Sequence, residues 1–117
     1  MVQHQVLDRT FSALSDSKRR EILDRLGRGP ASISELAAPL DISLTGLKKH
    51  VRILEEAKLV STEKIGRTRH CRLGPTNPRG SARVGLGPLG EVDSWLDSFR
   101  RRWNERYNRL EQHLRER

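Results

Sequence analysis

A chain of 117 residues, of which 34% are hydrophobic, can bury one modest core and has no room for a second independent domain. Its formal net charge of +8 favours polyanionic partners such as nucleic acid, whereas no apolar run approaches the roughly 18 residues that a membrane-spanning helix needs. The amino-terminal segment lacks a hydrophobic signal sequence and the only cysteine is Cys71, so we expect a cytoplasmic protein without a disulfide framework or a multi-cysteine zinc site.

Two short helices are predicted at the start of the chain. Apolar residues recur at helical spacing over 6–14, and the side chains of Ser15 and Asp16 are suited to cap a second helix that ends at Leu26. The segment 27–30, Gly-Arg-Gly-Pro, predicts a stop, because glycine tolerates the left-handed conformation of a helix end and proline cannot continue the hydrogen-bond ladder.

A third and a fourth helix are predicted to follow at once. Ser32 and Glu35 have the spacing of a capping box, with Ser34 as an alternative cap, and Pro39 keeps the third helix short. Ser43 is predicted to cap a longer fourth helix. The buried stripe of this helix is predicted to be Leu47, Val51 and Leu54. The side chains predicted to point away from the core are Thr45, Lys48, Lys49 and Arg52.

The second half of the chain divides into three segments with different predicted structures. Residues 59–64 and 68–73 are β-compatible runs on either side of a turn at 65–67, and predict a two-stranded hairpin. Residues 74–87 carry glycine and proline with little periodicity, which is typical of a flexible linker. From Pro88 the helical period returns along a stripe of Val92, Trp95, Leu96, Phe99, Trp103, Tyr107, Leu110 and Leu114. Because the small preceding domain cannot cover so much apolar surface, we expect part of this helix to face a second subunit.

Two short helices joined by a tight turn, the second with polar and basic residues near its start, match a helix-turn-helix over 34–57. The major groove of DNA admits one helix, so we expect the following residues to contact bases: Ser43, Thr45, Lys48 and Lys49. Arg52 is predicted to contact the backbone, and Gly46 to allow close approach to DNA. The tip of the hairpin is predicted to add phosphate or minor-groove contacts through Lys64, Arg67 and Arg69. The alternative is that these charges only solvate exposed surfaces.

Three segments resemble the ArsR type of winged-helix repressor. They are FSALSDSKRREILDRL (11–26), SISELAAPLDISLTGLKKHVRILEEAKLV (32–60) and EKIGRTRHCRL (63–73). The resemblance implies a mainly helical winged helix-turn-helix with a small β-hairpin, which binds double-stranded operator DNA as a homodimer built on the first and last helices. With the stripe described above, it places Phe11, Trp95, Phe99, Trp103, Tyr107 and Leu110 at the dimer interface. The expected units are a DNA-binding domain over 1–73, a linker over 74–87 and a dimerisation helix over 88–117.

The chain departs from that family in its candidate metal ligands. Family members commonly bind metal through a cysteine pair in the helix corresponding to 34–38, and this sequence has no cysteine there. His113 and Glu116 have a ligand-like spacing, but the upstream pair that would complete a zinc site is missing. We therefore expect no metal or other cofactor. The neighbours of Cys71, His70 and Arg72, could lower its pKa and make it oxidisable; the alternative is a half-buried strand residue.

Competing functions remain open at the level of the sequence. No motif brings together a nucleophile, a base and an orienting group, so an enzyme is not expected. A regulator that responds to a ligand or an oxidant would use Trp95, Trp103 and Tyr107 to line a pocket at the dimer interface, whereas plain interface packing explains the same spacing. A winged module that binds protein or RNA is a third alternative. The sequence does not identify an effector.

Overall fold

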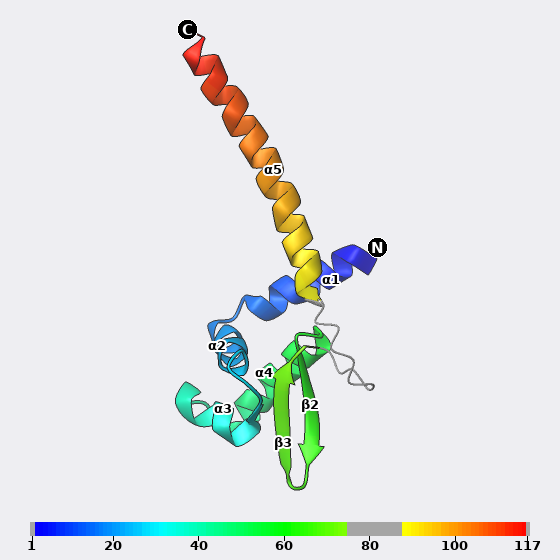
Figure 1. Cartoon of the computed structure of the whole chain (residues 1–117). Coiled ribbons are helices and arrows are strands. Elements are labelled where there is room, and N and C mark those ends of the chain that lie inside the picture. The colour runs from blue at the N-terminus through cyan, green and yellow to red at the C-terminus, as the bar shows by residue number, and fades with distance from the viewer. Residues whose placement is uncertain (1, 75–87, 117) are drawn as a thin grey trace.

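The computed structural model describes residues 2–74 and 88–116, and the side chains from residue 5 onward in the first range. Its elements in chain order are α1 (Val2–Leu14), α2 (Ser17–Leu26), β1 (Ala31–Ser32), α3 (Ile33–Leu40), α4 (Leu44–Glu56), β2 (Val60–Ile65), β3 (Thr68–Leu73) and α5 (Pro88–Arg115). Helices α1–α4 and the sheet form a small body, and α5 extends away from it on the side opposite to the tip of the β2–β3 hairpin (Figure 1). The prediction of a mainly helical winged helix-turn-helix is confirmed.

The hydrophobic core lies between α2, α3, α4 and the sheet. Ile22, Leu36, Leu47 and Leu54 have almost no exposed surface. Val51, one turn after Leu47 on α4, completes the predicted stripe and is also buried. Because α4 places this stripe in the core, its opposite face remains on the surface of the molecule.

Side-chain caps set where the short helices begin. Asp16 caps α2 by accepting hydrogen bonds from the backbone N–H groups of Lys18 (2.8 Å) and Arg19 (3.2 Å). These bonds lower the pKa of the Asp16 carboxyl, the bond from Arg19 most strongly. The conformation at the end of α2 differs from the prediction: Gly27 is right-handed, with φ of −62°, and the positive φ, +141°, falls at Gly29.

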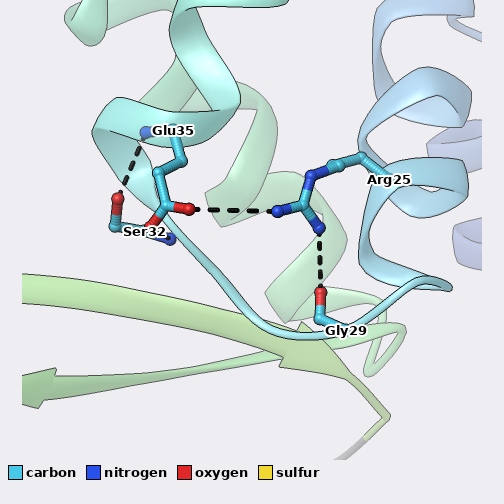
Figure 2. A network of polar contacts seen from close by, with 4 residues as sticks. All are labelled: Arg25, Gly29, Ser32 and Glu35. Atoms are coloured by element: carbon cyan, nitrogen blue, oxygen red, sulfur yellow. Dashed lines mark hydrogen bonds and ion pairs between the residues drawn. The ribbon is translucent and has the colours of Figure 1, made fainter.

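A capping box fixes the start of α3, and its glutamate also contacts α2. Ser32 Oγ accepts from the N–H of Glu35 at 3.1 Å, and Glu35 Oε1 accepts from the N–H of Ser32 at 3.2 Å (Figure 2). Ser32, and not Ser34, is therefore the cap. Arg25 of α2 approaches the Glu35 carboxylate at 3.9 Å and donates to the carbonyl of Gly29 at 3.2 Å (Figure 2). The ion pair adds a weak, solvent-screened contact to the apolar packing of α2 on α3, the first helix of the helix-turn-helix.

The sheet has a third strand that the sequence did not predict. Its order is β1-β3-β2, and both pairs are antiparallel. Ala31 and Ser32 of β1 pair with Cys71 and His70 of β3. A strand of two residues is too short to show alternation in the sequence, so only its tertiary pairing reveals it. The hairpin turn itself matches the prediction within one residue, and Gly66 supplies its positive φ of 65°.

Helix α5 begins at Pro88, as predicted, and of the described elements it meets α1 near its first turns before it extends away (Figure 1). Its 28 residues span about 42 Å, because an α-helix rises 1.5 Å per residue. Val92 is its one buried residue among those described. The predicted linker lies outside the described residues after Gly74. No helix in the described ranges is both long enough and apolar enough to cross a membrane.

Candidate nucleic-acid interface

Helix α4 has the geometry of a recognition helix. Ser43 caps it, with Oγ accepting from the N–H of Gly46 at 3.0 Å. A Cβ atom at position 46 would sit 3.3 Å from this Oγ, so glycine keeps room for the cap. The side chains predicted to leave the core are all exposed: Thr45, Lys48, Lys49 and Arg52. The cap therefore fixes where a polar, basic helix face begins.

A groove runs between α4, the start of α3 and the wing, by which we mean residues 60–73. It has a volume of about 630 Å³. Its cationic lining consists of Lys48, Arg52, Lys64, Arg67 and Arg69. The structure thus brings together five of the nine residues predicted to bind DNA. The other four lie on α4 and at its start but do not line this groove: Ser43, Thr45, Gly46 and Lys49.

The wing concentrates positive charge in an unfavourable arrangement. Lys64 and Arg69 are direct cross-strand partners, and like charges in such positions repel each other. All residues from 63 to 69 are exposed, so both charges are accessible to a binding partner. An anion bound between or beside these side chains relieves the repulsion, which is the role that a DNA phosphate can play.

Four polar residues that line the groove were not among the predicted DNA contacts: Ser34, Glu55, Thr62 and Thr68. Two of them, Glu55 and Thr62, are joined by hydrogen bonds. Glu55 Oε2 accepts from Thr62 Oγ1 at 2.6 Å and from the Thr62 N–H at 3.2 Å, and Thr62 Oγ1 in turn accepts from Arg69 at 2.7 Å. The position of Glu55, one turn after Arg52 on α4, was a signal that it lies on the same helix face. Its contact with Thr62 joins two elements and has no signature in the sequence.

His50 is a packing residue at a helix interface. Its Nδ1 lies 3.3 Å from the guanidinium of Arg19, and the ring is half-buried between α2 and α4. The same guanidinium donates to the backbone carbonyls of Ala13 at 2.8 Å and Ser12 at 3.1 Å, at the end of α1. Arg19 therefore ties three helices together, and His50 is part of that tie.

The hypothesis of an activated thiol at Cys71 is wrong. Cys71 is 1% exposed, and burial raises the pKa of its thiol to about 11. Neighbours in a strand point to opposite faces, so His70 and Arg72 lie on the other side of the sheet from the core that holds Cys71. The residue is also more deeply buried than the half-buried alternative supposed.

Within residues 2–74 and 88–116, no three His, Cys, Asp or Glu side chains gather as a metal site would require. His113 and Glu116 are both exposed at the end of α5. Glu116 there accepts a long hydrogen bond, 3.5 Å, from the Gln112 side chain.

Helices α1 and α5 together display an aromatic surface. Phe11 meets Trp95 edge to face, with ring centroids 5.8 Å apart, and Trp95 stacks on Phe99 at 5.6 Å. Phe99 in turn lies 6.3 Å from Trp103. The six residues predicted at the dimer interface remain between 41% and 65% exposed: Phe11, Trp95, Phe99, Trp103, Tyr107 and Leu110. The structure joins the first four in one row, and the row continues along α5.

Comparison with known proteins agrees with this architecture. A family model described as a helix-turn-helix domain matches residues 14–63. The chain is 39% identical over 69 residues to the HTH-type transcriptional regulator Rv2034 of Mycobacterium tuberculosis, covering 59% of this chain and 64% of that protein. It is 31% identical to the transcriptional repressor SdpR of Bacillus subtilis, covering 60% of this chain and 78% of the repressor. The first of these matches thus spans slightly less than two thirds of its relative.

A solved structure extends the likeness beyond the helix-turn-helix. The crystal structure of an ArsR family transcriptional regulator superposes with a TM-score of 0.72 at 36% identity, covering 86% of this chain and 92% of that one. Transcriptional regulators of this kind are not ordinarily enzymes. The chain belongs to the ArsR family of winged helix-turn-helix transcriptional regulators.

Proposed function

We propose that this protein is a repressor that binds a specific duplex DNA sequence as a homodimer. The observation that carries the proposal is the groove in which Lys48 and Arg52 of the recognition helix face Lys64, Arg67 and Arg69 of the wing. Helix α4 enters the major groove, where a lysine can donate to guanine and exposed hydroxyls can reach base edges. The wing follows the neighbouring phosphates and contributes affinity more than sequence choice.

The two exposed faces of α4 have different roles in this proposal. Thr45 and Lys49 lie one turn apart on the exposed face outside the groove, close to the helix start, where a recognition helix contacts bases. Lys48 and Arg52, also one turn apart, face the wing. Ser43, at the N-cap, lies where backbone N–H groups and the helix dipole favour a phosphate. Gly46 serves the cap in this arrangement.

The aromatic surface of α1 and α5 supports the homodimer. Most of α5 has no covering element in the described chain, yet it exposes Trp103, Tyr107 and Leu110 by more than half. A row of such side chains is unfavourable in water unless a second surface covers it. In this proposal, residues 88–117 are the dimerisation helix, residues 1–73 the DNA-binding domain and residues 74–87 the connection between them.

Charge along α5 favours an antiparallel pairing of the two copies. Residues 88–99 carry Glu91, Asp93 and Asp97 and no lysine or arginine. Residues 100–115 carry only the acids Glu105 and Glu111 and are rich in arginine: Arg100, Arg101, Arg102, Arg106, Arg109 and Arg115. An antiparallel pair places the acidic half of each helix beside the basic half of the other, whereas a parallel pair places like charges together.

A two-fold dimer predicts an operator that is an inverted repeat, with half-sites about one helical turn of DNA apart. The direct test is to select bound fragments from the host genome with the purified protein and to align them. An inverted repeat enriched near the start of genes supports the proposal. Recovery of random fragments, or preferential recovery of RNA in a parallel selection, refutes it in favour of a non-specific or RNA-binding module.

A further inference from the structure

The DNA-binding groove contains a carboxylate whose presence needs an explanation. Among the residues that the structure describes along the groove, Glu55 is the one with a negative charge. A carboxylate beside a phosphate track repels DNA, so on charge alone position 55 favours any neutral or basic residue. Its side chain is nevertheless exposed and directed towards the wing, where it makes the hydrogen bonds to Thr62.

These bonds lie where the contact between the wing and the rest of the protein ends. Thr62 is half-buried, whereas every residue from 63 to 69 is exposed. β2 is an edge strand, since the sheet order is β1-β3-β2, so part of its backbone has no strand to bond. Glu55 accepts the N–H of Thr62 and closes this edge against α4. The attachment of the wing to the recognition helix therefore ends at this contact.

The hydroxyl of Thr62 links Glu55 to Arg69 on the neighbouring strand β3. A hydroxyl has one proton, so Thr62 donates it to Glu55 at 2.6 Å and can only accept from Arg69, at 2.7 Å. Arg69 is the diagonal neighbour of Thr62 in the hairpin and the direct neighbour of Lys64, which repels it. The bond to Thr62 holds the guanidinium on the groove side of the wing against this repulsion.

We propose that Glu55 is a positioning residue for DNA binding: it fixes the wing against α4 and, through Thr62, holds Arg69 in place to contact a phosphate. This inference rests on the proposed function. It predicts an outcome opposite in sign to simple electrostatics. Removal of the Glu55 charge weakens DNA binding, although the protein becomes more positive.

The test measures binding to a mixed-sequence duplex of about 30 base pairs, long enough for two half-sites, by fluorescence anisotropy between roughly 50 and 200 mM salt. Glu55→Ala is expected to weaken DNA binding by about fivefold, the effect of losing the hydrogen bond from Arg69 to one phosphate, and to lower the salt slope by about one. The matched control is Glu56→Ala, which removes the same charge from an exposed neighbour that lines a different hollow, beside Asp8 and Arg9. This control is expected to bind at least as tightly as the wild type.

Two further variants separate positioning from a general loss of structure. Thr62→Val keeps a β-branched strand residue but removes the hydroxyl, and is expected to reproduce the lower salt slope with little change in Tm. The loss in the double variant Glu55→Ala/Arg69→Ala is expected to be smaller than the sum of the two single losses, because part of the Glu55 effect passes through Arg69. Hydrogen exchange at Gly66 and Arg67 in the free protein is expected to accelerate in Glu55→Ala and to stay unchanged in Glu56→Ala.

Four results bear against the inference or its basis, and they can be told apart. Tighter binding by Glu55→Ala with an unchanged salt slope shows that the carboxylate only repels DNA and overturns the positioning role. Additive losses in the double variant overturn the link to Arg69. A wild-type protein that binds no duplex refutes the proposed function itself, whereas wild-type binding with an unaffected Glu55→Ala refutes only the role of Glu55.

Discussion

Trp103 offers the sharpest test of the proposed homodimer. It lies in the middle of the exposed row on α5 and is 65% exposed in the single chain. A tryptophan offers up to roughly 250 Å² of surface, so about 160 Å² of Trp103 faces solvent. If the second copy covers half of this area, each protomer gains about 2 kcal/mol at 25 cal/mol per Å², and the symmetric dimer about 4 kcal/mol.

Trp103→Glu removes this burial and places a carboxylate in the interface. The lost apolar contact alone is expected to raise the dimer dissociation constant about a thousandfold, and desolvation of the carboxylate adds to the effect. Sedimentation velocity over a range of protein concentrations measures the shift. The matched control is Asn108→Glu, which adds the same charge to an exposed position roughly 140° around the helix. An unaltered dimer for Trp103→Glu, or equal disruption by Asn108→Glu, refutes the assignment of this face.

Four other predictions follow from single residues. Lys49→Ala is expected to weaken operator binding by about 1 to 3 kcal/mol and to relax sequence preference in a mutant-operator titration; equal losses on all duplexes would reassign it to phosphate. Arg67→Ala is expected to lower the salt slope of binding by about one, and an unchanged slope removes the wing tip from the interface. The backbone hydrogen bond from Ser32 lowers the pKa of Glu35 below its unfolded value of about 4.5. The ionised carboxylate therefore stabilises the fold fully above that pH, and the stabilisation is lost as the pH falls through the lower pKa of the folded protein. Over this range the Tm of Glu35→Gln is expected to fall less than the Tm of the wild type, and parallel curves of Tm against pH would contradict this. Cys71, with its raised pKa, is expected to react with a thiol reagent at pH 8 only after unfolding, and rapid labelling of the native protein would contradict its burial.

Much of the fold follows from local signals in the sequence. Asp16, Ser32 and Ser43 cap the helices that their positions predicted, because a cap is a contact between residues two or three apart. The apolar spacing of α4 placed its buried stripe, and the glycine at position 66 placed the turn of the wing. In each case, the chemistry that fixes the structure lies within one turn of the chain.

The features that escaped prediction depend on residues far apart in the sequence. The short strand β1 exists only through its pairing with β3, and the bond between Glu55 and Thr62 only through the docking of the wing on α4. For Cys71, the adjacent basic residues suggested a reactive thiol, whereas the alternation of strand side chains sends those charges to the opposite face. Candidate DNA contacts could be nominated from exposure, but their division between groove and outer face needed the fold.

The central claim is that two copies of this chain read one duplex with sequence specificity. A competition titration tests it most directly, with a labelled duplex recovered by genomic selection and an unlabelled shuffled duplex of the same composition. We expect the selected duplex to bind at least about a thousandfold more tightly at physiological salt, with two protomers per site. Equal competition by the shuffled duplex, or saturation at one protomer per site, would contradict the account.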